Sequence, residues 1–215
     1  MDYSRDLPNP PLLVITDRQQ AKKPLEEIVG VAFAAGCRWA SIREKDLPPQ
    51  DQVALASRLR EVAQSYGAVV TLHGEPELAR AAGVAGVHLS AGSDVHAARR
   101  LLGREALVGI SVHSRAEAER LDGVAIDYMV AGPAFETASK PGYGPGLGIE
   151  GIAEIARATR IPLIAIGGVS ADGAAAILRA GAAGVAVMGG IMRCADPAAA
   201  IQGLLAALRG FQGQQ

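Results

Sequence analysis

The sequence predicts a closed (β/α)8 barrel that forms a single domain over residues 1–215. Short runs rich in branched apolar residues alternate with helical segments about eight times along the chain. These runs lack a polar–apolar alternation, which is typical of parallel strands covered on both faces. The last two runs, Pro162–Ile166 and Gly184–Met188, each end in a glycine pair. A doubly wound open sheet also fits βα alternation, but eight units and paired glycines after the last two strands favour the barrel.

The strands are expected where the apolar runs lie: Leu12–Thr16, Trp39–Arg43, Val69–His73, Gly86–Leu89, Ala106–Ser111, Tyr128–Gly132, Pro162–Ile166 and Gly184–Met188. Helices are expected over Pro24–Gly36, Gln50–Tyr66, Pro76–Ala82, Asp94–Gly103, Ile149–Thr159, Ala171–Gly181 and Pro197–Leu208, with one more capped by Ser114 and Glu117. Residues 133–148 form a long loop rich in glycine and proline, and loops of that length are usually functional or disordered. The lead-in at 1–11 and the tail at 210–215 are expected to be flexible.

Composition excludes several classes of protein. Hydrophobic residues make up 49% and charged residues 20% of the chain, as in globular proteins. A net charge of −1 gives no reason to expect a nucleic acid or a membrane as partner. Cys37 and Cys194 lie far apart without metal-ligand spacing, and the first residues show no signal-peptide pattern. We therefore expect a cytoplasmic protein with reduced thiols.

A phosphate site is expected at the carboxyl ends of the strands, where barrels place their active sites. Gly167 and Gly168 follow one strand, and Gly189 and Gly190 follow the next. A glycine pair lets the backbone approach a ligand closely and point its N–H groups at an anion. The alternative is that these glycines serve only tight packing between strand and helix.

Two cations, Arg43 and Lys45, end the second strand. Residues at i and i+2 of a strand face the same way, so both side chains could meet an anion in the barrel mouth. The alternative is that they are solvated or paired with the adjacent Glu44 and Asp46.

Three of the four histidines fall at predicted strand ends: His73, His88 and His113. His113 lies beside a helix N-terminus, which favours a neutral ring able to act as a base. His88, inside an apolar run, is expected to be a core residue, and the fourth, His96, a surface residue. The three could also coordinate a metal, but no pattern of supporting carboxylates accompanies them, so we predict none.

Seven motifs can be compared with known families: ITD at Ile15–Asp17, IREK at Ile42–Lys45, GVHL at Gly86–Leu89, GISVHS at Gly109–Ser114, FETASK at Phe135–Lys140, IPLIAIGGV at Ile161–Val169 and AGAAGVAVMGGI at Ala180–Ile191. Together they resemble the thiamine-phosphate-synthase-like superfamily over essentially the full chain. The resemblance implies the (β/α)8 fold and offers two branches.

The synthase branch joins a pyrimidine diphosphate to a thiazole phosphate and releases pyrophosphate with the help of Mg²⁺. It usually carries an Asn-Asp pair after the third strand and a further Asp after the fourth, and these acids hold the metal. Here the matching positions are His73 with Gly74, and Ser93, while Asp94 is one residue late. The glutamine usual before the second-strand motif is replaced by Ser41. Because Mg²⁺ usually needs carboxylate ligands, we expect no metal cofactor.

The TenI branch, described as thiazole tautomerases, keeps the phosphate cradle and lacks the metal acids. The resemblance therefore implies a metal-free proton shift that aromatises a carboxythiazole phosphate, with His113 as the catalytic base or proton shuttle. The cradle would be Gly167, Gly168, Gly189 and Gly190. The other substrate contacts would come from Arg43, Lys45, His73, Ser111, Thr137 and Lys140.

Two alternatives to the tautomerase remain: a thiamine-phosphate synthase, and a non-catalytic barrel that binds a thiazole or thiamine phosphate as a regulator. All three take a phosphorylated ligand. Barrels of this size commonly pair, so a homodimer is expected.

Overall fold

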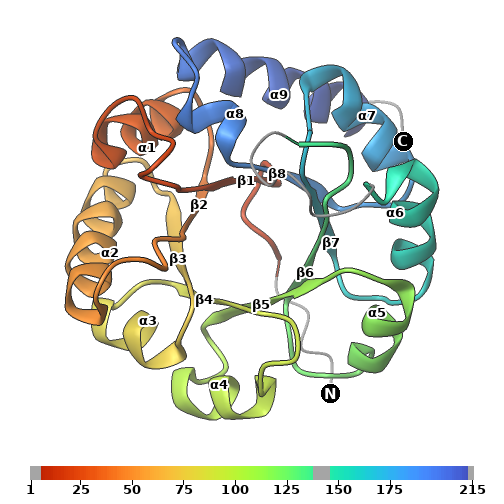
Figure 1. Cartoon of the computed structure of the whole chain (residues 1–215), viewed down its shortest axis with the longest axis horizontal. Helices are drawn as coiled ribbons and strands as arrows, with labels where there is room; N and C mark the ends of the chain where they lie inside the picture. Colours follow the sequence, from red (N-terminus) through yellow and green to blue (C-terminus); the bar gives the residue numbers. More distant parts are fainter. Residues whose placement is uncertain (1–5, 138–145, 213–215) are drawn as a thin grey trace.

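The sheet closes on itself as a barrel of parallel strands ringed by helices, which confirms the predicted fold class (Figure 1). The computed structural model describes residues 6–137 and 146–212. The strands are β1 (Leu12–Ile15), β2 (Trp39–Ile42), β3 (Val69–His73), β4 (Gly86–Leu89), β5 (Leu107–Val112), β6 (Tyr128–Ala131), β7 (Leu163–Ile166) and β8 (Gly184–Val187). Each pairs with its neighbours in sequence, and β8 closes the ring on β1, with Leu13 opposite Ala186. A twisted parallel sheet of eight strands can close in this way because the strands tilt.

The helices cover the outside of the ring: α1 (Leu25–Ala34), α2 (Pro49–Gln64), α3 (Pro76–Ala82), α4 (Val95–Leu102), α5 (Arg115–Leu121), α6 (Gly148–Arg157), α7 (Ala171–Arg179), α8 (Gly189–Met192) and α9 (Pro197–Gln212). Asp94 and Ser114 cap α4 and α5 as predicted, accepting from the backbone N–H groups of Ala97 and Glu117. The short α8 directly after β8 is not among the predicted elements. None of the helices, within the ranges the structure covers, is long and apolar enough to cross a membrane.

The core has two parts, because successive residues of a strand face opposite sides of the sheet. Leu12 and Val14 face outward and pack against the helices. The inward-facing side chains form a separate inner cluster of Leu13, Ile15, Trp39, Tyr128, Val130, Ile164 and Ala186. Trp39 and Tyr128 meet edge to face, with ring centroids 4.7 Å apart.

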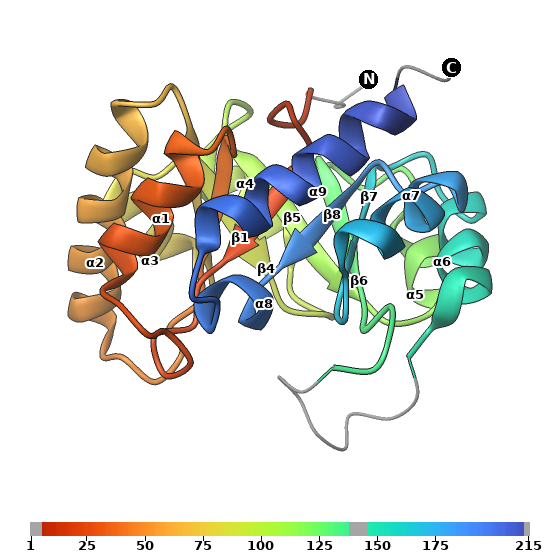
Figure 2. The ribbon, with the colours of Figure 1, turned by 90° about the horizontal axis from the view of Figure 1, so that it is seen from above.

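The two ends of the barrel differ. Leu7, in the segment before β1, packs against the inner cluster. Figure 2 shows α8 at the other end, where the strands finish. The residues before Asp6 and after Gln212 lie outside the described chain, so the flexibility of both ends stays a prediction. The end beside α8 is the one where a barrel places its site.

Candidate active site

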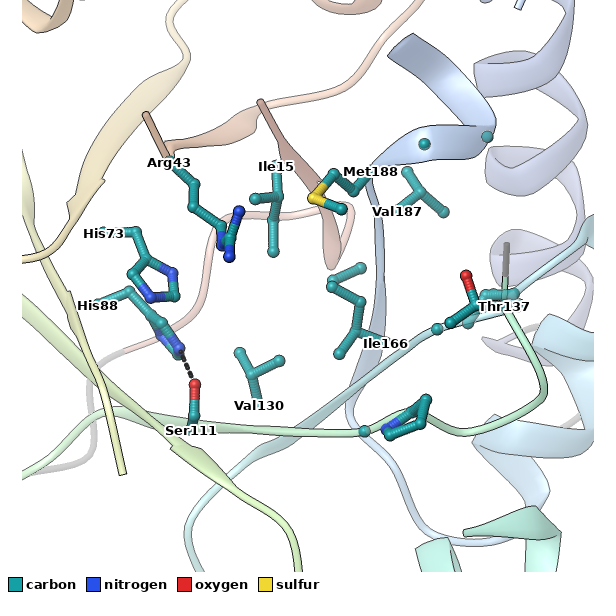
Figure 3. A pocket seen from close by; sticks show the side chains of 18 of the residues that line it. Ile15, Arg43, His73, His88, Ser111, Val130, Thr137, Ile166, Val187 and Met188 are labelled. Carbon is teal, nitrogen blue, oxygen red and sulfur yellow. Dashed lines mark hydrogen bonds between the residues drawn. The ribbon is translucent and has the colours of Figure 1, made fainter. Parts of the chain in front are cut away.

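A cavity of about 360 Å³ opens at the carboxyl ends of the strands, and we call it the mouth cavity. Its apolar lining is Ile15, Val130, Pro133, Ile166, Val169, Ala186, Val187 and Met188. Its other lining residues are Arg43, His73, His88, Ser111, Gly132, His113, Glu136, Thr137, Gly167, Gly168, Gly189, Gly190 and Arg193. Figure 3 shows Arg43, His73 and His88 on one side and Thr137 across from them. This volume suits a small ligand held by a few polar groups.

The structure gathers most of the predicted site residues around the mouth cavity. The four glycines, Arg43, His73, Ser111, His113 and Thr137 all line it. Lys45 does not line it, and Lys140 lies outside the described residues. Their roles toward a ligand stay predictions.

Arg43 is positioned by a buried network behind the cavity wall. Its backbone N–H donates to Thr16 Oγ1 at 3.0 Å, and the Thr16 hydroxyl donates to Glu44 Oε1 at 2.7 Å. The Glu44 carboxylate, 2% exposed, also accepts from the backbone N–H of Arg18 at 3.0 Å. Burial raises the pKa of Glu44, while the Thr16 and Arg18 hydrogen bonds oppose that rise. Glu44 therefore joins the ends of β1 and β2 and is no surface partner for the flanking cations.

Lys45 departs from the expected geometry because β2 ends at Ile42. The i, i+2 rule holds only within a strand, and residues 45 and 46 lie in a turn. Lys45 is exposed, and its pKa is lowered by partial desolvation and by the charge of Arg43. Only Arg43 of this pair contributes its side chain to the cavity lining.

His88 is a core residue, as expected, and also part of the cavity wall. It is 2% exposed, and its Nε2 lies 2.9 Å from Ser111 Oγ. Burial, with a further contribution from the charge of Lys45, lowers the pKa of His88 to about 3, so the ring is neutral at physiological pH. Its ring centroid is 4.8 Å from that of His73. Within the described chain, its buried Nδ1 has no hydrogen-bond partner.

His113 lies at the cavity edge, just after β5. Its Nδ1 is 3.0 Å from the carbonyl oxygen of Gly132, and its backbone N–H donates to Glu117 Oε2 at 2.6 Å. A carbonyl can only accept, so Nδ1 carries the proton and Nε2 of the neutral ring does not. In a regular capping box Glu117 would accept from the backbone N–H of the cap residue, Ser114. Here it accepts from the preceding residue, His113.

The glycines after β7 are required by packing. Gly167 and Gly168 have φ of +100° and +63°, and a Cβ there would come within 2.7 Å of Pro133 and 2.6 Å of the Glu136 carbonyl oxygen. Gly190, after β8, faces open space. The packing interpretation therefore accounts for the first pair. In the second pair Gly189 is buried and Gly190 is exposed.

Two charged lining residues, Arg193 and Glu136, were not predicted as site residues. Arg193 caps the C-terminal end of α8 and donates to Gln20 Oε1. In the sequence, Arg193 could have been identified from its position, a cation one helical turn after the second glycine pair. Glu136 is the one carboxylate of the lining within the described ranges.

No three His, Cys, Asp or Glu side chains in the described ranges are grouped so that they could hold a metal ion. His73, His88 and His113 share the cavity without forming such a group. Asp94, the acid nearest to the expected position, is exposed and accepts from Ala97 N at 2.9 Å as the cap of α4. The residues present therefore do not fit the magnesium site that the synthase branch implies.

The chain is similar to known thiamine-phosphate synthases. The sequence model of the family described as thiamine monophosphate synthase matches residues 12–191. A thiamine-phosphate synthase of Roseiflexus sp. (strain RS-1) is 37% identical over 198 residues, which is 91% of this chain and 84% of that protein. A putative thiamine-phosphate synthase of Geobacter sulfurreducens is 38% identical over 199 residues, 92% and 93% of the two chains. The solved structure of thiamine phosphate pyrophosphorylase from Pyrococcus furiosus superposes with a TM-score of 0.83, at 29% identity, over 93% of this chain and 96% of that one.

These matches correct the functional prediction. The assignment to the tautomerase branch is wrong, because relatives that cover most of the chain carry the synthase name. The absence of acids at Gly74 and Ser93 led to that assignment. Despite this absence, the chain as a whole is similar in sequence to relatives named as synthases. The matches favour the synthase alternative, and the chain belongs to the thiamine monophosphate synthase family.

Proposed function

We propose that the chain is a transferase of the thiamine-phosphate synthase type, which joins a pyrimidine diphosphate to a thiazole phosphate and releases pyrophosphate. The observation that carries this proposal is the similarity to synthases over nine-tenths of the chain. The match to the Roseiflexus synthase, for example, covers 91% of this chain. The mouth cavity supports it, because it combines cations, backbone donors and an apolar floor.

The cavity has suitable groups for two charged ends and the rings between them. Arg43 belongs to the wall after β2, while the glycine pairs follow β7 and β8, which lie three and two strands away around the ring. Ile15, Val130 and Ile166 line the space between (Figure 3). An arginine binds phosphate oxygens through two parallel N–H groups, and apolar side chains accommodate flat rings. A thiazole phosphate at the glycine edge would leave the diphosphate beside Arg43.

The transfer step needs charge stabilisation more than a proton acceptor. When the bond to the diphosphate breaks, the leaving oxygen keeps the electron pair, and negative charge grows on it. Arg43, fixed through Thr16 and Glu44, offers a positioned cation at that point. His113 holds a proton on Nδ1 toward Gly132 and presents an unprotonated Nε2 in its neutral form. The side chains in residues 6–137 and 146–212 offer no group of ligands for a metal, so the charge on the leaving oxygen would be stabilised by the protein's own cations.

The direct test is to incubate the purified protein with both substrates and to measure thiamine phosphate by chromatography, with Mg²⁺ and, separately, with EDTA. We expect product in at least one condition, and none when either substrate is omitted. A folded protein that binds thiazole phosphate but makes no product in both conditions would contradict the transferase and favour the regulatory barrel. The cytoplasmic location and the homodimer stay predictions.

A further inference from the structure

We propose that this chain binds the diphosphate end of its ligand through its own cations and donors, at a site formed by Arg43, His73 and Ser111, without a divalent metal ion. This inference rests on the proposed function and deepens it. It starts from the disagreement between the side chains at the mouth and the metal site of the synthase branch.

The positions where that branch carries metal acids cannot supply a ligand set here. Gly74 has no side chain, and its N–H donates to the carbonyl of His88. Ser93 offers only a hydroxyl. Glu136, the cavity carboxylate among the described residues, follows β6, three strands around the ring from β3. Mg²⁺ usually requires one or two carboxylates beside the phosphate oxygens, and this wall has none.

What stands at this wall is suited to an anion. The Arg43 side chain extends into the cavity beside His73 and His88 (Figure 3). Its guanidinium is always protonated and matches the geometry of phosphate oxygens. His73, at the end of β3, contributes a ring on the same side of the cavity. The positive charge of the Arg43 guanidinium would repel a free divalent cation and attract an anion.

The buried His88 holds the Ser111 side chain in place at the cavity wall that carries Arg43 and His73. It is 2% exposed, and its Nε2 holds Ser111 Oγ at 2.9 Å. A hydroxyl held by a fixed neighbour can donate to a ligand with little loss of rotamer freedom. Because the neutral His88 ring carries one proton, Nε2 must donate it to Ser111 Oγ for the hydroxyl to donate to the ligand. Nδ1 is then an unprotonated acceptor and is not a contact for an anion.

The test is isothermal titration of the full chain with inorganic pyrophosphate, once with EDTA and once with saturating Mg²⁺. Pyrophosphate represents the diphosphate end of the substrate, and the readout does not depend on turnover. We expect binding in EDTA to be at least as tight as in Mg²⁺. Binding that is tenfold or more weaker in EDTA would overturn the inference.

Two variants locate the site, each with a matched control. We expect Arg43→Gln and His73→Ala each to weaken pyrophosphate binding in EDTA about tenfold, because each removes a hydrogen bond to a charged phosphate oxygen. Arg209→Gln and His96→Gln replace the same residue types at exposed positions of α9 and α4, and should bind like the wild type. Wild-type affinity in Arg43→Gln would place the anion elsewhere and overturn the inference.

The outcomes separate this inference from the proposed function. Product that forms only with Mg²⁺, together with pyrophosphate binding only with Mg²⁺, would keep the transferase and overturn the metal-free site. Binding of pyrophosphate in EDTA with no product in any condition would keep the site and contradict the transferase. Product and binding that both persist in EDTA would support both.

Discussion

His88 Nε2 lies 2.9 Å from Ser111 Oγ and links β4 to β5 at the wall of the mouth cavity. The ring is also within 5.5 Å of the Tyr128 ring, centroid to centroid, and 4.8 Å of the His73 ring. An aromatic series therefore runs from Trp39 through Tyr128 and His88 to the cavity, and a buried, neutral histidine is part of it. The buried neutral ring makes the free energy of unfolding depend on pH.

Acidification should destabilise the protein through His88. The pKa of the folded state is about 3, against 6.5 for the ordinary side chain, so the unfolded chain takes up the proton first as the pH falls. The contribution of the neutral His88 ring to the free energy of unfolding is present above pH 6.5 and is lost as the pH falls from there toward 3. Between pH 7 and pH 5 the loss should be about 2 kcal/mol in the free energy of unfolding, measured by urea denaturation.

A variant without the titrating ring isolates this effect. His88→Asn should show a change between pH 7 and pH 5 that is smaller than the wild-type change by this amount. His96→Gln, which removes an exposed histidine, should keep the wild-type pH dependence. An equal pH dependence in His88→Asn and the wild type would contradict the buried neutral ring.

Thr16 should act on both stability and ligand binding. Thr16→Val removes the acceptor for the Arg43 N–H and one donor to the buried Glu44 carboxylate. We expect a loss of about 1–3 kcal/mol in unfolding free energy and weaker pyrophosphate binding. Thr16→Ser keeps the hydroxyl and should retain most of both properties. If valine and serine behave alike in both measurements, the network does not position Arg43.

Gly109 should tolerate no side chain, because the Tyr128 ring occupies that space. A Cβ at Gly109 would lie 2.1 Å from Tyr128 Cζ. Gly109→Ala is expected to lower the unfolding free energy by about 1–3 kcal/mol or more through overpacking. The control is Gly30→Ala in α1, where the new Cβ would meet Val62 at 3.6 Å. That change should stabilise the protein by about 0.5–1 kcal/mol, since glycine is a poor helix residue.

His113 should carry its proton on Nδ1 at a pH where the ring is neutral, because Nδ1 donates to the Gly132 carbonyl. Nitrogen NMR of the imidazole distinguishes the two tautomers directly. The exposed His96 provides an internal comparison, because the described residues show no such carbonyl acceptor for its ring. A His113 signal with the proton on Nε2 would contradict the observed bond.

Local pattern was enough to predict the barrel and the position of its mouth. The apolar runs fix strands because a parallel strand is buried on both faces, and the glycines and caps fix where helices begin and end. Arg43, His73, Ser111 and His113 could be predicted as neighbours because they end consecutive or nearby strands of one ring. The branch assignment failed because it depended on a few positions, chiefly Gly74 and Ser93, whereas the similarity to synthases extends over 91% of the chain.

The sequence by itself thus determined the strand order and which strand ends face the cavity. Only the tertiary structure decided that Glu44 is buried under the wall, that Lys45 leaves it, and that Arg193 reaches it from α8. The physical reason is the separation along the chain of the residues that interact. Alternation along a strand is local, but the end of β2 and the direction of α8 are set by packing between segments far apart in the chain.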